Sequence, residues 1–161
     1  MGRITKKINM KVLRKIAWIM LGVAGSGKST WIKNNLGNGI LVISKDGIRE
    51  ELGIINGTKK AIGNKEQEGE VTKIQKMRME KAMLQGIPFV LDNTNLGKDL
   101  GGIVAELKRR GYKVVGVKIN TPIETCIKRR PEIPKDILIN MDRKLRELNL
   151  SIFDKIIEVE I

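Results

Sequence analysis

Short apolar runs alternate along the chain with longer segments whose apolar residues recur at helical spacing. Runs rich in Ile, Val and Leu that end at polar or glycine-containing turns are typical of strands. The predicted strands are residues 16–21, 40–43, 88–91, 113–119 and 156–161. The predicted helices cover about residues 28–36, 46–52, 66–85, 100–110, 122–130 and 135–148. Strands that alternate with helices in this way indicate the α/β class with a mainly parallel central sheet.

The segment 66–85 is the longest predicted helix. Its apolar positions are Val71, Ile74, Met77, Met79, Ala82 and Met83. Methionine adapts to irregular core gaps, so these methionines are interpreted as core residues rather than as a binding stripe. Residues 53–65 before this helix contain three glycines and three lysines, which predicts a mobile loop.

The loop after the first predicted strand has the spacing G-x-x-x-x-G-K-[ST], which is the P-loop pattern. Glycines let the backbone turn tightly and bring several N–H groups onto a polyphosphate, and the following helix adds its positive end. An ordinary glycine-rich turn is the alternative, but a strand-like run before the loop and a helix after it are the context that the motif requires. The motif predicts a P-loop NTPase-type three-layer sandwich that binds ATP and Mg²⁺. Predicted nucleotide-binding residues are Gly22, Ala24, Gly25, Ser26, Gly27, Lys28, Ser29 and Thr30, with Lys28 on the β- and γ-phosphates and Ser29 on the metal.

Composition restricts the chemistry further. The 161 residues include one cysteine, Cys126, and no histidine, so a disulfide within the chain and a Ser-His or Cys-His pair are excluded. Any general base is therefore a carboxylate or a lysine. The formal net charge is +13, which favours a polyanionic partner such as nucleic acid.

Residues 1–15 form a basic leader with six lysines and arginines, and residues 16–161 are predicted to form a single kinase-type domain. The leader is either an arm that touches nucleic acid or a solvated segment. No apolar run is long enough to span a bilayer, so the expected location is cytoplasmic and no membrane partner is expected.

Polar residues follow three of the predicted strands, at the edge of the sheet where α/β proteins bind ligands. Asp46, after the second strand, is a candidate general base that accepts a proton from an attacking hydroxyl; the alternative is a helix N-cap. Asp92 ends the third strand, either as a carboxylate linked to Mg²⁺ or as turn chemistry, and it is followed by Asn93, Thr94 and Asn95.

A basic segment, Lys128, Arg129 and Arg130, ends the predicted helix 122–130. Cations at a helix C-terminus are stabilising in themselves, which is one interpretation. The other is a lid whose arginine closes over the transferring phosphoryl group.

Three segments together resemble the phage polynucleotide 5′-hydroxyl kinase domain. They are GSGKSTW at residues 25–31, ISKDGIR at 43–49 and DNTNL at 92–96, with further similarity at 118–122 and 133–138. The resemblance covers about residues 16–148. It implies that Asp46 is the base for the 5′-hydroxyl, that Arg49 binds a substrate phosphate and that Asp92 supports the acceptor side, with the neighbouring 93–95 also on the substrate. It also implies a catalytic lid arginine, and because residues 129–134 are shorter than the family's lid, Arg129 and Arg130 are not assigned separately.

The function expected from the sequence is therefore transfer of the γ-phosphoryl of ATP to a 5′-hydroxyl of DNA or RNA. The phosphatase motif D-x-D-G-T of the phage enzyme is absent from the sequence, so removal of 3′ phosphates is not expected. A small-molecule kinase acting on a sugar, antibiotic or nucleotide is the main alternative, because the fold and the P-loop alone do not separate the two. A nucleic-acid-binding ATPase switch that transfers no phosphate is a second alternative.

Overall fold

The computed structural model describes residues 15–53 and 65–161. The predicted basic leader, apart from Lys15, and nearly all of the predicted mobile loop lie outside these ranges. The strands are β1 (Ile16–Leu21), β2 (Leu41–Ile43), β3 (Phe89–Leu91), β4 (Lys113–Asn120) and β5 (Lys155–Glu160). The helices are α2 (Lys28–Asn35), α3 (Lys45–Glu51), α5 (Lys65–Gln85), α6 (Leu100–Arg109), α7 (Ile123–Arg129) and α8 (Lys135–Glu147), with a 3₁₀ turn, η1, at Leu150–Ile152.

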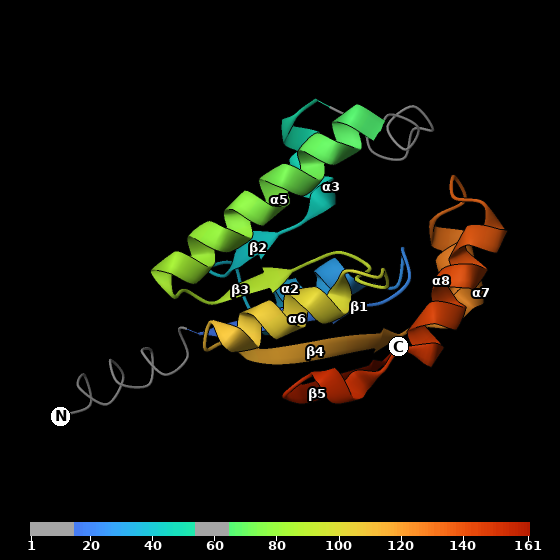
Figure 1. Cartoon of the computed structure of the whole chain (residues 1–161). Helices are drawn as coiled ribbons and strands as arrows, with labels where there is room; N and C mark the ends of the chain where they lie inside the picture. The colour runs from blue at the N-terminus through green and yellow to red at the C-terminus, as the bar shows by residue number, and fades with distance from the viewer. Residues whose placement is uncertain (1–14, 54–64) are drawn as a thin grey trace.

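The five strands form one parallel sheet in the order β2-β3-β1-β4-β5 (Figure 1). β1 is central, with Trp18 paired to Val90 of β3 on one side and to Val115 of β4 on the other. Because every strand runs the same way, the loops that follow β1, β2 and β3 leave from the same edge of the sheet. The α/β class with a parallel sheet is confirmed.

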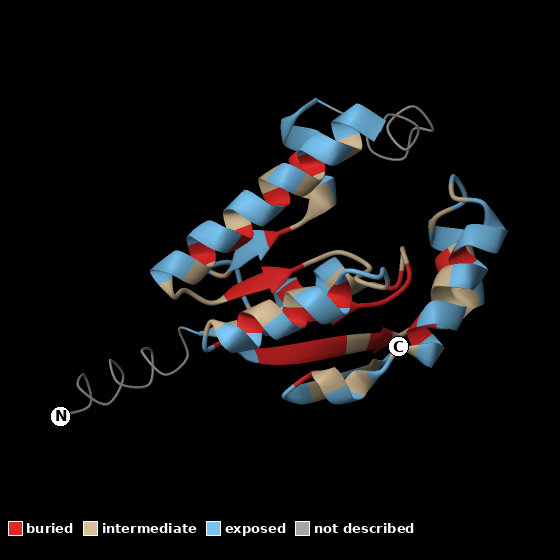
Figure 2. Cartoon of the chain, in the orientation of Figure 1, coloured by how far each residue is buried: buried red, intermediate tan, exposed pale blue. Residues whose placement is uncertain are grey.

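Two hydrophobic clusters lie on opposite faces of the sheet. The larger one includes Ile19 and Leu21 of β1 and is covered by α5, α6, α7 and α8. The smaller one includes Met20 of β1 and Val117 of β4, and Ile32 of α2 packs against it. Successive residues of a strand point to opposite faces, so β1 supplies side chains to both clusters. Figure 2 shows this burial concentrated in the inner strands and on the inner faces of the helices, whereas the edge strands β2 and β5 are mostly exposed or intermediate.

The predicted elements match the observed ones within one or two residues at nearly every end, but one detail of α5 was wrong. Val71, Met79 and Ala82 are buried as predicted, whereas Met77 is 69% exposed. Gln75 is buried in this helix, on the face that the pattern reserved for apolar side chains. The buried amide oxygen of Gln75 has a partner there, because Asn93 Nδ2 donates a hydrogen bond to Gln75 Oε1 over 2.8 Å.

Gly116 in β4 is required by packing rather than by backbone conformation. A Cβ atom built at this position would lie 2.7 Å from Cδ1 of Ile156 and 3.0 Å from Cγ of Phe153. These two side chains come from β5 and the turn before it. They occupy the space that the Cβ atom of any other residue at position 116 would need. The contact packs β5 and the turn before it closely against β4.

Gly116→Ala is expected to lower the unfolding free energy by about 1–3 kcal/mol, because overpacking a close-packed core forces its neighbours to move. The matched control is Gly102→Ala in α6, where a Cβ meets no atom within 4 Å. That change is expected to stabilise by about 0.5–1 kcal/mol through helix propensity. Urea denaturation of both variants measures the difference. Equal stability of the two variants would contradict the packing role of Gly116.

Candidate active site

The P-loop connects β1 to α2 and depends on two glycines in the left-handed region. Gly25 has φ +82° and Gly27 has φ +102°, conformations that residues with a Cβ rarely adopt. Gly27 is also the N-cap of α2, and its carbonyl accepts the first helical hydrogen bond, from the N–H of Trp31. The N-terminus of α2 therefore opens directly at the loop, where its free N–H groups and dipole favour an anion.

Lys28 lies under this loop. Its Nζ donates to the carbonyl oxygens of Gly22, over 3.2 Å, and of Val23, over 3.0 Å. Burial lowers the pKa of the Lys28 ammonium, and the charge of Asp92 partly opposes this shift. The lysine predicted to reach the β- and γ-phosphates is thus held within the loop by backbone carbonyls.

Ser29 and Asp92 meet across the gap between the ends of β1 and β3. Ser29 Oγ donates to Asp92 Oδ2 over 2.8 Å. Burial raises the pKa of the Asp92 carboxyl, against the hydrogen bond from Ser29 and the charge of Lys28. A hydroxyl and a carboxylate side by side at a P-loop are oxygen ligands of the type that Mg²⁺ takes, with phosphate and water completing its octahedron.

The residues after Asp92 have structural partners. Asn93 accepts a hydrogen bond from the N–H of Lys45 over 2.9 Å and donates to Gln75, so it ties the start of α3 to α5. Asn95 is left-handed, with φ +56°, and its amide donates to the carbonyls of Met20, Leu91 and Asn93. The side chains of Asn93 and Asn95 thus form hydrogen bonds that hold the turn and its neighbours together, as the turn interpretation of this segment expects. The carbonyl of Thr94 accepts from the N–H of Gly22 over 3.4 Å, and Thr94 lines the cleft.

Asp46 lies in the first turn of α3 and is not the N-cap of that helix. Ser44 is the N-cap, and its hydroxyl accepts a hydrogen bond from the N–H of Gly47 over 2.9 Å. The Asp46 side chain is 72% exposed and pairs with Arg49, whose Nη1 lies 2.6 Å from Asp46 Oδ1. The capping alternative for Asp46 is thus wrong, while its assignment as general base stays a prediction.

Arg49 has a second partner that sequence reasoning missed. Its Nε and Nη2 donate to the two carboxylate oxygens of Glu68 in α5, over 2.9 and 2.8 Å. Glu68 is 19 residues further along the chain and in another helix, so no motif linked it to Arg49. The sequence could have revealed this pair only if the side of the helix 66–85 that faces α3 had been known. That side depends on how the two helices pack.

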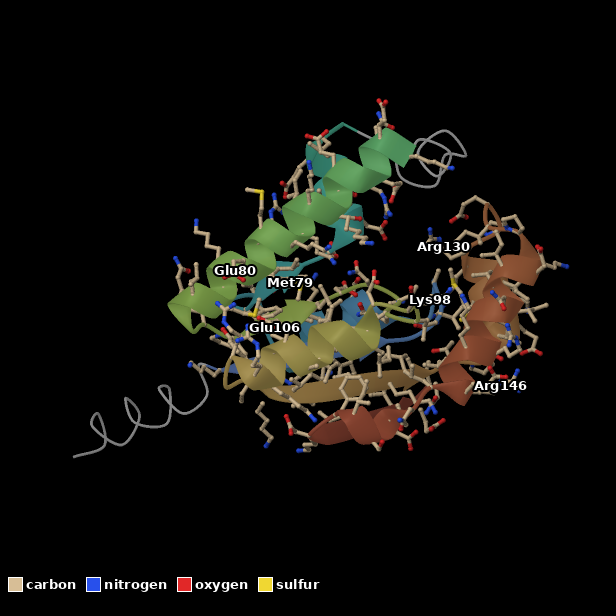
Figure 3. All side chains as sticks on the ribbon, in the orientation of Figure 1. Met79, Glu80, Lys98, Glu106, Arg130 and Arg146 are labelled. Carbon is tan, nitrogen blue, oxygen red and sulfur yellow. The ribbon has the colours of Figure 1, made fainter. Side chains whose placement is uncertain are left out.

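Both predicted lid arginines reach the P-loop. Arg129 Nη1 donates to the carbonyl of Gly25 over 3.1 Å. Arg130 packs against the same glycine, because a Cβ there would lie 2.8 Å from its Cγ, and its guanidinium pairs with Glu132. In Figure 3, Arg130 lies on the side of the α7–α8 pair that faces α3 and α5.

These groups surround a cleft of about 290 Å³ at the carboxyl edge of the sheet. Its lining combines the P-loop with the ends of β2 and β3 and the end of α7; among its residues are Gly25, Lys28, Ser29, Asp46, Asp92 and Arg130. A second pocket, of about 500 Å³, shares Gly25, Gly27 and Thr30 with the first and extends along α2 to Trp31, Asn34 and Arg129. The first cleft thus brings most of the predicted nucleotide-binding residues together with Asp46 and Arg130, whereas Gly22 and Ser26 do not line it and Arg129 lines the second pocket. Arg49 does not line the first cleft.

A family model described as an AAA domain matches residues 18–132, from β1 to the end of the basic segment. The chain belongs to this family. The match includes the P-loop, Asp46, Asp92 and the two arginines predicted to form a lid, Arg129 and Arg130. No curated protein matches the chain.

Solved structures show the same fold at low sequence identity. A structure of the PezAT toxin–antitoxin system of Streptococcus pneumoniae is 23% identical, with a TM-score of 0.61 over 98% of this chain and 76% of the other. The Pnkp1/Rnl/Hen1 complex contains a chain that is 18% identical, with a TM-score of 0.61 over 72% of this chain and 39% of that one. Shikimate kinase from Acinetobacter baumannii, in complex with shikimate, is 17% identical, with a TM-score of 0.56 over 93% and 87% of the two chains. The fold is therefore a P-loop kinase-like α/β sandwich, and the resemblance to a phage polynucleotide kinase finds no specific support among these matches.

Within residues 15–53 and 65–161, no helix is both long enough and apolar enough to cross a membrane.

The raised pKa of Asp92 has a measurable consequence for stability. The pKa of this carboxyl is higher in the folded protein than in the unfolded chain. Its contribution to stability is therefore fully present below the pKa of the unfolded chain, and it is lost as the pH rises through the pKa of the folded protein. At pH 7 without ligand, Asp92→Asn is therefore expected to raise the melting temperature, since the amide oxygen still accepts from Ser29. The same variant is expected to lose the additional stabilisation that Mg²⁺ gives in the presence of ATP. Thermal unfolding with ATP, with and without Mg²⁺, tests both parts; a lower ligand-free melting temperature would refute the first.

Proposed function

We propose that this protein transfers the γ-phosphoryl of ATP to a hydroxyl group of an acceptor, in the presence of Mg²⁺. One observation carries the proposal: the P-loop, the Ser29–Asp92 pair and the exposed carboxylate of Asp46 line a single cleft. A nucleotide-binding loop alone would serve a switch or a transporter equally well. The exposed carboxylate of Asp46, whose Oδ1 pairs with Arg49, adds the group that an attacking hydroxyl requires.

Each group then has a role. The backbone N–H groups of the P-loop and Lys28 bind the β- and γ-phosphates, and Lys28 exchanges its carbonyl partners for phosphate oxygens. Ser29 and Asp92 hold Mg²⁺, which neutralises charge on the phosphates when it is bound. Asp46 accepts the proton of the attacking hydroxyl, and Arg130 adds positive charge where charge develops on the transferring group.

The second pocket is proposed to take the nucleoside part of ATP. It adjoins the P-loop at Gly25 and Gly27, so a chain of phosphates bound there leads into it. Trp31 offers an aromatic face and Arg129 a planar cation, both of which stack on bases. Asn34 lines the same pocket and can hydrogen-bond to a base or a ribose.

The proposed acceptor is the 5′-hydroxyl of DNA or RNA. It is supported by the three motifs shared with polynucleotide kinases, by the net charge of +13 and by the fold shared with a chain of the Pnkp1/Rnl/Hen1 complex. A small uncharged acceptor is the second candidate, favoured by a specific observation. Arg49, expected to bind a substrate phosphate, is already paired with two carboxylates.

Transfer of labelled γ-phosphate to a short 5′-hydroxyl oligonucleotide tests the proposal, with a 5′-phosphorylated copy as control. Label on the 5′-hydroxyl oligonucleotide alone, decreasing with added salt, is the expected result. ATP binding without transfer to any oligonucleotide would favour the small acceptor, and a panel of sugars and nucleosides would then be assayed. Hydrolysis of ATP stimulated by nucleic acid, with no labelled acceptor, would indicate the ATPase switch.

Asp46→Asn is expected to reduce transfer by at least about 10²-fold, the contribution of a positioned general base, and to leave ATP affinity nearly unchanged. Asp46 is exposed and caps no helix, so the substitution leaves the fold intact. Single-turnover transfer and ATP titration measure the two quantities. Undiminished transfer would remove Asp46 from the reaction.

Lys28→Ala is expected to reduce transfer by about 10²-fold or more whatever the acceptor, because it removes a cation from the phosphates in a partly desolvated site. Lys33→Ala is the matched control: it lies in the same helix, is exposed and does not line the nucleotide cleft. A fully active Lys28→Ala enzyme would contradict the assignment of the P-loop.

A further inference from the structure

Arg49 lies between two carboxylates that come from different helices. Arg49 Nε and Nη2 donate to the two carboxylate oxygens of Glu68 in α5, over 2.9 and 2.8 Å. Arg49 Nη1 donates to Asp46 Oδ1 in α3, over 2.6 Å. The side chains of Arg49 and Glu68 are 23% and 29% exposed, which makes this pair better shielded than most ion pairs on the described surface. Three of the five N–H donors of the guanidinium are therefore engaged by carboxylate oxygens.

The contact with Glu68 has the geometry that an arginine uses for phosphate. Two parallel N–H donors meeting two oxygens is the bidentate arrangement common to Arg–carboxylate and Arg–phosphate pairs. Both anions present the same pair of oxygens, so they compete for one edge of the guanidinium. Two carboxylates around one guanidinium also leave the group of three with a net charge of −1, which repels a further anion.

The position of Glu68 is fixed by its surroundings. α3 and α5 share a small separate core, in which Ile48 and Val71 are fully buried and Ile74 packs against them. Thr72 Oγ1 donates to the carbonyl of Glu68 over 3.0 Å. The hydrogen bonds from Arg49 lower the pKa of the Glu68 carboxyl, and burial opposes this shift without reversing it, so the carboxylate is ionised at neutral pH. Lys45 adds a weaker attraction from the start of α3.

We propose that Glu68 determines acceptor specificity by occupying the edge of Arg49 that a phosphate of the acceptor would otherwise bind. This inference rests on the proposed function, in which Asp46 marks the acceptor end of the cleft and Arg49, its partner, is the expected binding group for a phosphate of the acceptor. An acceptor with a phosphate next to its reactive hydroxyl must displace Glu68 from Arg49, whereas an acceptor without one leaves the group of three intact. Glu68 thus weakens the binding of any phosphate-bearing acceptor, the 5′-terminal nucleotide of DNA or RNA included, relative to an acceptor without that phosphate, and it does so from outside the cleft lining.

Glu68→Gln is expected to free Arg49 for phosphate. Glutamine has nearly the same shape, but it is neutral and offers one acceptor oxygen, so the net charge of the group rises from −1 to 0. Glu68→Asp keeps the charge and is expected to resemble the native protein more than the glutamine variant does. Glu70→Gln is the matched control, because it makes the same change on an exposed position of the same helix.

The direct test uses inorganic phosphate and the Nε–H resonance of Arg49, assigned by its loss in Arg49→Lys. The P-loop is first saturated with Mg²⁺ and a non-hydrolysable ATP analogue, so that phosphate does not bind there. Phosphate is expected to shift the resonance of Glu68→Gln at a concentration about three- to tenfold lower than in the native protein and Glu70→Gln, the effect of removing one competing ion pair. Equal concentrations in all three proteins would overturn the proposal.

A kinetic test compares thymidine with thymidine 3′-monophosphate as acceptors. Glu68→Gln is expected to lower KM for the 3′-monophosphate about three- to tenfold and to leave KM for thymidine unchanged. A fall in kcat for both acceptors, with no selective change in KM, would instead make Glu68 a support for Asp46 and refute the proposal. If the native protein phosphorylates neither acceptor, the oligonucleotide assay alone decides the proposed nucleic-acid function, and the phosphate titration decides the role of Glu68.

Discussion

The central place of β1 in the sheet is the constraint on which the site depends. β1 pairs with β4 along its whole length and with β3 at Ala17–Ile19, so its middle is held by strands on both sides and its direction is fixed. The P-loop that follows inherits this position, and β3 delivers Asp92 beside Ser29 because the two parallel strands end at one edge. Without the pairing of β1 with β3, a serine and an aspartate 63 residues apart would have no reason to meet. The arrangement of the sheet thus decides which polar residues become a site.

Lys28 and Asp92 show how the fold prepares charge for a ligand. Burial opposes the charged form of both, lowering the pKa of the lysine and raising that of the aspartate, while each partly restores the charge of the other. A polyphosphate with Mg²⁺ supplies an anion to the first and a cation to the second. The cost of placing these groups in a partly desolvated cleft is met during folding, so little reorganisation is needed when the ligand binds.

The sequence predicts those parts of the site that are continuous in the chain. The P-loop and the strand before it follow from local spacing, since residues 16–30 contain both the motif and its context. Asp46 and Asp92 follow from their places at strand ends, because parallel strands bring such residues together. Contacts between helices are different, because no local pattern records them. The pairing of Arg49 with Glu68, the buried Gln75 and the exposed Met77 all depend on how α5 lies against its neighbours. The choice between Ser44 and Asp46 as N-cap also needed the backbone, as both residue types cap helices well.

The positive charge is unevenly distributed along the chain, so the net charge of +13 is limited evidence that the acceptor is a nucleic acid. Residues 1–14 contain five lysines and arginines and residues 54–64 contain two, with no acidic residue in either stretch, so these stretches carry seven of the thirteen excess charges. Beside the proposed acceptor end of the cleft, by contrast, Asp46 and Glu68 outnumber Arg49. A polyanion attracted by the basic stretches therefore meets, at Arg49, a guanidinium that is already paired with two carboxylates. Attraction of nucleic acid to the protein and recognition of a phosphate beside the reacting hydroxyl are separate properties, because the first depends on the summed charge and the second on one edge of one guanidinium.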